Sequence, residues 1–336
     1  MEKYIVNGRI GEGAHGIVLR GIDKSSMKVV AMKRVALKNI NEQGLPNSAV
    51  RELLALRLIR HDYVTNLVDY FSQGYSLVLV CEYLPIDLNE FLRSNVKPLA
   101  ISHVKSYMWM LASAVEYIHS LHIMHRDLKP ANLLIGFRGE LKVTDFGLCR
   151  VFRNPELVGS TNNEKDQKLF THQVASRWYR APELLYGSRT YGPEVDLWAM
   201  GCIFGEMLKN SPLFPGENDI GQLCTVIQVL GTPDEEIWPG VSSLPDFHKI
   251  SFTNTQKQIS FKEILTEVDE SSRIMLERFL RYCPKSRITA QEFLEASYFH
   301  QEPPMTPLND LPLPVVKPLN TATAEFANWD WSATHF

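Results

Sequence analysis

The sequence predicts an α+β protein in which a small β-rich lobe precedes a larger, mostly helical lobe. Short β-type runs with glycine turns occupy the start of the chain, whereas residues 101–120 contain no glycine or proline and are expected to form one long helix. Further helical patterns begin at Glu194. The chain is expected to cross between the lobes near Leu84, where a β-type run leads through Pro85 to a helix start at Asp87.

The composition is ordinary for a soluble globular protein. Of the 336 residues, 45% are hydrophobic and 22% are charged, and the net charge is −3, which does not suit a protein that coats nucleic acid or an anionic membrane. The start of the chain lacks the apolar core of a signal peptide, and no apolar run reaches about 18 residues, so we expect no membrane insertion. Five widely spaced cysteines without a Cys-x-x-Cys motif indicate a reducing compartment.

A glycine-rich segment lies between the first two β-type runs. Residues 4–10 lead into Gly11-Glu12-Gly13-Ala14-His15-Gly16, and Ile17-Val18-Leu19 follows at once. Because a dinucleotide-binding glycine loop would lead into a helix, this order argues against a dehydrogenase and predicts a hairpin that covers phosphate groups. An ordinary hairpin with glycines in its turn is the alternative.

A lysine stands in the middle of the next β-type run. Lys33 lies among the apolar residues of 29–35, where an unpaired ammonium group would be costly. The next helical pattern has Asn47 as its expected N-cap and an apolar face that includes Leu56. Glu52 lies beside this face, so we expect it to point inward and pair with Lys33.

The segment His125-Arg126-Asp127-Leu128-Lys129-Pro130-Ala131-Asn132 is a polar cluster between two strongly apolar stretches. A basic surface turn is one interpretation. The flanks favour another, in which reactive groups are held at the mouth of a core by a rigid scaffold. A short hairpin of residues 133–135 and 141–143 is expected to follow and to end at Asp145-Phe146-Gly147.

The remaining chain divides into an irregular loop, a set of helices and a tail. Residues 148–173 are polar and long for a loop in a compact domain, which indicates a functional segment. Prolines become frequent after Phe299, which predicts a tail without a core of its own. Helices are expected near residues 194–208, 219–230, 271–281 and 289–295, and the predicted divisions of the chain are 1–83, 84–299 and 300–336.

Together these motifs resemble, in order and spacing, those of the eukaryotic protein kinases over residues 4–299. The resemblance implies the bilobal protein kinase fold, with residues 1–83 as N-lobe and 84–299 as C-lobe. It also implies transfer of a phosphoryl group from ATP with Mg²⁺ as the metal cofactor. His125-Arg126-Asp127-Leu128-Lys129-Pro130 resembles the serine/threonine form of the catalytic loop.

The resemblance assigns roles residue by residue. Asp127 would orient the substrate hydroxyl, Lys129 would contact the γ-phosphate, and Ser176, where threonine is usual, would hydrogen-bond Asp127. Asn132 and Asp145 would hold Mg²⁺. Asp196 would anchor the catalytic loop, His125 would support Phe146, and Arg287 would pair with Glu183. The residues expected around the nucleotide are Ile10, Gly11, Glu12, Gly13, Ala14, His15, Gly16, Val18, Ala31, Lys33, Glu52, Cys81, Glu82, Tyr83, Leu84, Asp87, Leu134 and Asp145.

Within the family, residues 47–52 and 171–183 resemble the cyclin-contacting helix and the activation segment of the cyclin-dependent branch. Thr171 has the position of the activating phosphothreonine, and Arg51, Arg126 and Arg150 would receive its phosphate. A mitogen-activated kinase is a narrower alternative, but no tyrosine follows Thr171 at the position that those kinases require. A kinase that activates other cyclin-dependent kinases stays open.

The segments Val104-Lys105-Ser106-Tyr107 and Ser211-Pro212-Leu213-Phe214 resemble a cilium-associated subgroup of that branch. The implied function is phosphorylation of Ser/Thr-Pro sites in proteins, including other kinases, in the control of cilium assembly, cilium length or the cell cycle. The implied partners are such substrates and a cyclin or cyclin-like activator, without nucleic acid. The expected location is the cytoplasm, with the nucleus and the cilium as further sites.

Several positions depart from the pattern of the branch. Ala14-His15 replaces a phosphorylatable Thr-Tyr pair, and Cys81 occupies the gatekeeper position, where a bulky aromatic residue is usual. The smaller side chain should enlarge the pocket behind it. A scaffold without catalytic activity is the alternative function, but the presence of Lys33 and Asp127 argues against it.

Overall fold

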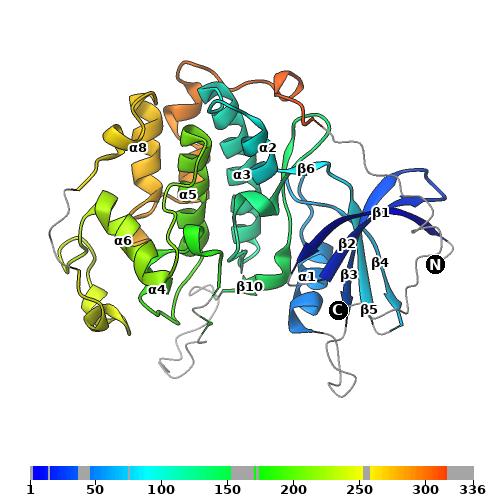
Figure 1. Ribbon diagram of the computed structural model, residues 1–336, viewed down its shortest axis with the longest axis horizontal. Coiled ribbons are helices and arrows are strands. Elements are labelled where there is room, and N and C mark those ends of the chain that lie inside the picture. Colours follow the sequence, from blue (N-terminus) through cyan, green and yellow to red (C-terminus); the bar gives the residue numbers. More distant parts are fainter. Residues whose placement is uncertain are drawn as a thin grey trace.

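The chain forms a β-rich lobe and a larger helical lobe that lie side by side and are joined by the segment between β5 (Ser76–Glu82) and β6 (Ile86–Asp87) (Figure 1). The computed structural model describes residues 3–13, 16–36, 46–74, 76–152, 170–171, 174–252 and 258–315. The predicted α+β division is confirmed within these ranges. None of the helices in them is long and apolar enough to cross a lipid bilayer.

A five-stranded antiparallel sheet makes up most of the smaller lobe, and its strands are in the order β1-β2-β3-β5-β4. One face is buried around Leu19, Met32 and Val80. Since side chains alternate along a strand, Val18 and Lys33, which are cross-strand partners, share the opposite face. That face looks toward the helical lobe. The strands are β1 Tyr4–Gly13, β2 Gly16–Asp23, β3 Val29–Ala36, β4 Leu67–Gln73 and β5 Ser76–Glu82.

The helix of the smaller lobe is α1, Asn47–Leu58. Our prediction that Asn47 is its N-cap is wrong, because Asn47 is the first helical residue and Pro46 takes the cap position without a side-chain hydrogen bond. The extended backbone of Pro46, with φ −53° and ψ 134°, sets the start of the helix. Ala49, Glu52, Ala55 and Leu56 form its buried side.

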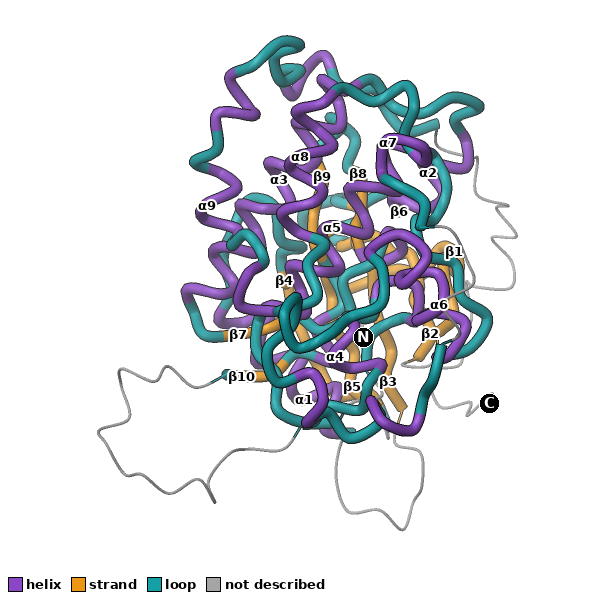
Figure 2. Tube along the Cα trace, turned by 90° about the vertical axis from the view of Figure 1, so that its left-hand side faces the viewer, coloured by secondary structure: helices purple, strands orange, loops and turns teal. Residues whose placement is uncertain are grey.

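The larger lobe is built around two long helices, α3 Ile101–Ser120 and α5 Glu194–Lys209. Every residue of α5 from Val195 to Leu208 is buried, and the other helices surround it (Figure 2). The bounds predicted for α3 and α6 are confirmed, whereas α8 ends earlier because Leu280 leaves the helical region of φ and ψ. The surrounding helices are α2 Leu88–Ser94, α4 Pro182–Leu185, α6 Asp219–Leu230, α7 Phe261–Ile264, α8 Glu270–Phe279 and α9 Ala290–Leu294.

Short strands frame the loops between the lobes. The predicted hairpin is present as β8 Leu133–Ile135 and β9 Leu141–Val143, and β6 Ile86–Asp87 extends it. A separate pair joins β7 Ile123–Met124 to β10 Arg150–Val151. This pair brings the two ends of the loop region between residues 124 and 150 together, so the catalytic loop and the Asp145 segment start from fixed positions.

The proline-rich segment 301–315 lies along the helical lobe. The buried Lys105 of α3 donates to the carbonyl oxygens of Gln301 and Pro303, at 2.7 and 2.8 Å. The next residue of α3 adds a contact, because the Ser106 hydroxyl donates to the Thr306 carbonyl oxygen at 2.8 Å. Leu311 then packs beside Gly139 in the β8–β9 turn.

Candidate active site

A lysine from the sheet, a glutamate from α1 and an aspartate from the loop after β9 form one ionic chain between the lobes. The Nζ atom of Lys33 donates to both carboxylate oxygens of Glu52 at 2.8 Å and to Oδ1 of Asp145 at 2.8 Å. The expected contact of Lys33 with Glu52 is therefore present. Burial alone lowers the pKa of Lys33, but the carboxylates of Glu52 and Asp145 outweigh it and raise the pKa, so the ammonium stays charged.

The loop after β7 gathers a second polar cluster around Asp127. Lys129 donates to Oδ2 of Asp127 at 2.8 Å, and the amide nitrogen of Asn132 donates to the same oxygen at 3.1 Å. The Ser176 hydroxyl donates to Oδ1 at 3.2 Å and accepts from Lys129 at 2.8 Å. The structure thus brings together the four residues that the sequence singled out for catalysis.

A buried aspartate holds this loop from below. The carboxylate of Asp196, on α5, accepts from the backbone N–H groups of His125 and Arg126 at 2.8 Å each. It also accepts from His119, at the end of α3, at 2.9 Å. Arg126 has a φ of +68°, an unfavourable conformation for a residue with a side chain, and these bonds hold it there. The contact of His125 with Phe146, with ring centroids 4.9 Å apart, is also present.

Most of the residues expected around the nucleotide come from β1, β2, β3, β5 and the segment of residues 82–87, whereas Leu134 lies on β8 and Asp145 follows β9. Ala31 and Cys81 are cross-strand partners, and burial raises the pKa of the Cys81 thiol to about 12. Gly16 has a φ of +132°, and a Cβ there would overlap the carbonyl oxygen of Arg34, so only glycine fits. Ala14 and His15, and the side chain of Glu12, lie outside the described residues.

The connecting segment, residues 82–87, is fixed by its own polar contacts. The carboxylate of Glu82 accepts from Lys142 at 2.9 Å and from the backbone N–H of Asn66 at 2.8 Å. Asp87 accepts from the backbone N–H of Glu90 and so caps α2, which explains its place at the helix start. Its carboxylate therefore has a structural partner besides any contact to a ligand.

Three arginines surround the start of the segment that leads to Thr171. Arg51 donates to the Gly147 carbonyl oxygen at 2.9 Å, and Arg126 donates to the Leu148 carbonyl oxygen at 2.7 Å. Burial lowers the pKa of Arg51, and the nearby positive charges of Arg150 and Arg126 lower it further. The structure therefore brings together the three arginines that the sequence grouped, which we call the arginine cluster.

Sequence reasoning missed the side chain that connects this cluster to Thr171. The hydroxyl of Tyr191 accepts from Arg126 at 2.8 Å and donates to the Thr171 carbonyl oxygen at 2.7 Å. It also missed His119 as a partner of Asp196. Neither residue has a local sequence signal, because its partner lies 20 or more positions away.

The segment after Thr171 is held against the helical lobe. Arg287, fully buried, donates to both carboxylate oxygens of Glu183 at 2.7 Å, as expected. Arg180 donates to the carbonyl oxygens of Val174 and Ala175, at 2.9 and 3.0 Å, and Ala175 has a φ of +64°. Residues 174–183 therefore have a fixed backbone beside Asp127.

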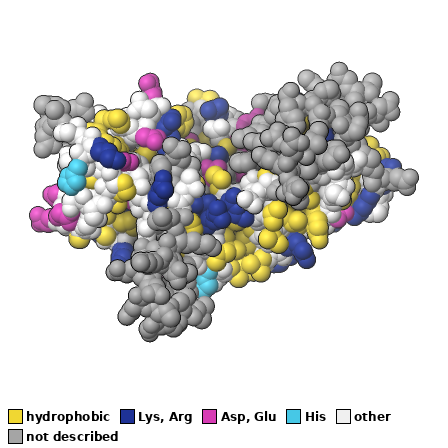
Figure 3. Space-filling view, turned by 90° about the horizontal axis from the view of Figure 1, so that it is seen from below, with side chains coloured by type: hydrophobic (Ala, Val, Ile, Leu, Met, Phe, Trp, Pro, Cys, Tyr) yellow, Lys and Arg dark blue, Asp and Glu magenta, His cyan; other side chains and the backbone are white. Residues whose placement is uncertain are grey.

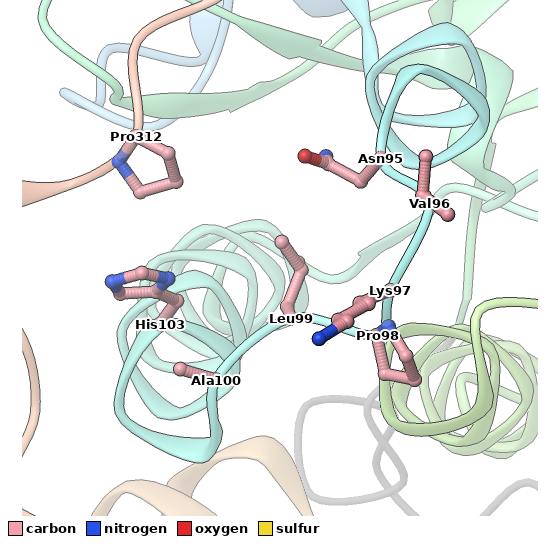
Figure 4. Close-up of a pocket in the computed structure, with 8 residues that line it drawn as sticks. All are labelled: Asn95, Val96, Lys97, Pro98, Leu99, Ala100, His103 and Pro312. Atoms are coloured by element: carbon pink, nitrogen blue, oxygen red, sulfur yellow. The ribbon is translucent and has the colours of Figure 1, made fainter.

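An open pocket of about 430 Å³ lies between the start of α3 and the C-terminal segment (Figure 4). Leu99 and Lys97, between α2 and α3, point into it, and Pro312 of the C-terminal segment forms one wall. It contains none of the residues predicted for catalysis or nucleotide binding.

Comparison with known proteins agrees with this geometry. The protein kinase domain family matches residues 4–299. Cyclin-dependent kinase 20 of Danio rerio is 50% identical over 315 residues, and that of Homo sapiens is 48% identical; each alignment covers 94% of this chain and 88% of the relative. Cyclin-dependent kinase 7 of Dictyostelium discoideum is 38% identical over 320 residues, 94% of this chain and 85% of the relative.

Among solved structures, a chain from the CAK complex of Chaetomium thermophilum bound to ATP-γ-S superimposes with a TM-score of 0.81. The two chains are 36% identical, and the match covers 93% of this chain and 96% of the other. The fold and the site define a protein kinase, and the chain belongs to the protein kinase domain family. Within it, the chain is a Ser/Thr kinase of the cyclin-dependent class, as the sequence predicted.

Proposed function

We propose that this kinase phosphorylates Ser/Thr-Pro sites in proteins, including other kinases, and is activated by phosphorylation of Thr171. The observation that carries this proposal is the closed set of hydrogen bonds among Asp127, Lys129, Asn132 and Ser176. In this set a carboxylate and an ammonium group are positioned before any substrate arrives. Preorganised charge of this kind is the main contribution a protein makes to phosphoryl transfer.

The roles follow from the chemistry of each group. Asp127 is acceptor-only when ionised, so it can orient a substrate hydroxyl and take its proton as the oxygen attacks. Lys129 would neutralise charge on the transferred phosphoryl group, because its Nζ lies between Asp127 and Ser176. Lys33 would hold the other phosphates, with Glu52 fixing its position.

The residues between the lobes fit Mg²⁺. The side-chain amide nitrogen of Asn132 donates hydrogen bonds to Asp127, so the amide oxygen is the group that can face a ligand. Asp145 adds a carboxylate, and Mg²⁺ prefers such hard oxygen donors. When bound, the ion would supply charge neutralisation for the phosphates. Asn132 and Asp145 would hold it.

The backbone beside Asp127 supports a preference for proline after the phosphorylated residue. The carbonyl oxygen of Ala175, next to Ser176, already accepts from Arg180 at 3.0 Å. A substrate residue that lies against this carbonyl would find its acceptor occupied, and its backbone N–H would lose a hydrogen bond. Proline has no N–H to satisfy, so it loses nothing there.

The arginine cluster supports activation at Thr171. Within the described residues, Arg51 and Arg126 have carbonyl or hydroxyl partners and no carboxylate partner. The Thr171 backbone lies next to them through Tyr191. A phosphate on Thr171 would bring a dianion to these guanidinium groups and replace weak partners by charge-assisted bonds.

The exposed side of α1 supports a cyclin-like activator. Val50, Leu54 and Leu58 are four residues apart, lie on one side of the helix, and are 38%, 57% and 57% exposed. The face of the molecule in Figure 3 shows hydrophobic side chains gathered beside Lys and Arg side chains. An apolar stripe of this kind needs a protein partner to cover it. The similarity to a chain of the CAK complex points the same way.

One experiment tests the proposal. Purified protein is given labelled ATP and two peptides that differ only in having proline or alanine after the target serine. We expect phosphorylation of the proline peptide to be at least about tenfold faster, because only the other peptide strands an N–H group. Transfer that is equal to both peptides would contradict the preference, and transfer that survives Asp127→Asn would contradict the catalytic assignment.

The cellular part of the proposal is control of cilium assembly, cilium length or the cell cycle, with the protein in the cytoplasm, nucleus and cilium. It rests on the sequence resemblance and on the similarity to cyclin-dependent kinases 20 and 7. The test is to replace the protein in ciliated cells by the Asp127→Asn variant and to measure cilium length. Normal cilia with the variant would contradict a catalytic role there.

A further inference from the structure

A cation and two aromatic rings meet at the connecting segment between the lobes. The guanidinium carbon of Arg20, on β2, lies 5.3 Å from the centre of the Tyr83 ring. On another side, the ring of Phe137 has its centre 6.1 Å from that of Tyr83, with the planes tilted by 47°. Tyr83 directly follows β5. It is contacted by Arg20 from the smaller lobe and by Phe137 from the larger lobe.

The sheet directs Arg20 to this place. Arg20 is the cross-strand partner of Ala31 and lies two residues after Val18, so all three side chains project from the cleft face of the sheet. The Nε atom of Arg20 is buried and has no hydrogen-bond partner among the described residues. The Arg20 side chain as a whole is partly buried, and the face of the Tyr83 ring is the contact that its guanidinium makes where Nε lacks a hydrogen bond.

Phe137 is held from behind, although its side chain is 56% exposed. It lies in the turn between β8 and β9, two residues before Gly139, which has a φ of +84°. Leu311 of the C-terminal segment is buried against this turn, and a Cβ on Gly139 would come within 2.8 Å of it. The turn is thus fixed between the C-terminal segment and the connecting segment.

We propose that Arg20 and Phe137 are positioning residues that hold Tyr83 from the two lobes and so set the affinity of the cleft for nucleotide. The residues proposed to contact a nucleotide include Val18 of β2 and residues 82–84 of the connecting segment, and the Arg20–Tyr83 contact joins these two segments. Without it, binding must order these two segments first, which weakens affinity. This inference rests on the proposed use of ATP at this cleft.

The contacts of Arg20 and Phe137 with Tyr83, which we call the brace, lie apart from the reacting groups. Lys33 and Asp127 make their hydrogen bonds to Glu52, Asp145, Lys129 and Ser176, and none of these contacts involves Arg20 or Phe137. Loss of the brace should therefore change nucleotide affinity more than the rate of the chemical step. This split distinguishes a positioning role from general destabilisation, which would lower the amount of active enzyme and hence the apparent kcat.

The test measures KM for ATP and kcat in full-length variants that change the charge of residue 20 or the ring of residue 137. Arg20→Met keeps the stem and removes the charge, and we expect the KM for ATP to rise about fivefold, with kcat within about twofold. Arg20→Lys keeps a cation and should stay within about twofold of the native KM. Phe137→Ala should raise KM about twofold, and Phe137→Tyr, which keeps the ring, should restore it.

A double-mutant cycle and a binding titration complete the test. If the two side chains act through one contact, adding Arg20→Met to Tyr83→Leu should raise KM no further than Tyr83→Leu alone. Independent, multiplying effects would overturn the proposal. Calorimetric titration with ADP should show the same loss of affinity; a native protein that binds ADP no better than Arg20→Met also overturns it. A native protein that neither binds ADP nor transfers phosphate overturns the proposed function as well.

Discussion

Two clusters of charged side chains start from neighbouring residues of one loop, Asp127 and Arg126, yet they are satisfied in opposite ways. Asp127 is bonded to an ammonium, a hydroxyl and an amide, so opposite charges are already in place. Arg51 and Arg126 of the arginine cluster have only carbonyl and hydroxyl partners within the described residues, and burial together with the nearby charges of Arg150 and Arg126 lowers the pKa of Arg51. The Asp127 cluster is thus assembled, whereas no described residue gives Arg51 or Arg126 a carboxylate partner.

Removing the negative charge of Asp127 from the assembled cluster should cause the largest loss of kcat. Asp127→Asn keeps the size of the side chain but removes the acceptor for the substrate proton, so we expect kcat to fall by about 10²–10⁴. Steady-state transfer to a Ser-Pro peptide measures it. Asp310→Asn makes the same chemical change at an exposed residue outside the site and should leave kcat near the native value. A small loss in Asp127→Asn would place the proton acceptor elsewhere.

The next largest effect should come from changing Asp196, whose carboxylate holds the loop that carries both clusters. Asp196→Asn replaces a carboxylate that accepts from His119 and from two backbone N–H groups by an amide that must turn a donor toward one of them. We expect the free energy of unfolding to fall by about 3 kcal/mol, measured by urea titration. Unchanged stability would mean that Arg126 can keep its positive φ without this support.

The incomplete cluster should respond only when an anion is present. Arg150 is exposed and should bind phosphate on Thr171, so Arg150→Met should reduce the activation produced by that phosphate about tenfold. The rates of the phosphorylated and unphosphorylated forms give the activation as a ratio. Arg138→Met, a change at a well exposed arginine in the β8–β9 turn, is the matched control. An equal ratio in both variants would exclude Arg150 from the phosphate site.

The smallest expected effect is a loss of folding stability at low pH that arises from Asp196. Burial raises the pKa of Asp196, but the hydrogen bond and charge of His119, the charge of His125 and the backbone N–H of Arg126 outweigh it and bring the pKa below its ordinary value of 3.8. A carboxyl whose pKa is lower in the folded state stabilises the fold above pH 3.8, and this contribution is lost as the pH falls through the folded-state value. Urea titrations from about pH 5 down to about pH 2 should show this loss in the native protein and a weaker one in Asp196→Asn.

The same contrast explains what could be predicted from the sequence. A lysine amid apolar strand residues demands a partner, and this local cost was enough to predict Lys33 with Glu52. The long helix α3 was predictable because no glycine or proline interrupts it. The motif spacing, through the family resemblance, then placed Asp127, Ser176 and the arginine cluster.

The contacts that were missed depend on tertiary structure. His119 and Asp196 are 77 positions apart, and nothing local to either residue indicates the other. Tyr191 connects Arg126 to Thr171 only because the chain folds back, and the aromatic brace on Tyr83 joins segments from both lobes. Asn47 was misplaced as a cap because Pro46 sets the start of α1, a choice between adjacent residues that propensity does not decide.

The most direct test of the account is the rate of phosphate transfer to a Ser-Pro peptide before and after stoichiometric phosphorylation of Thr171. We expect a rise of at least about tenfold, because a dianion would give the arginine cluster an anionic partner while the Asp127 cluster is already formed. Thr171→Ala taken through the same treatment should show no rise. Equal rates before and after phosphorylation, or the same rise in Thr171→Ala, would contradict it.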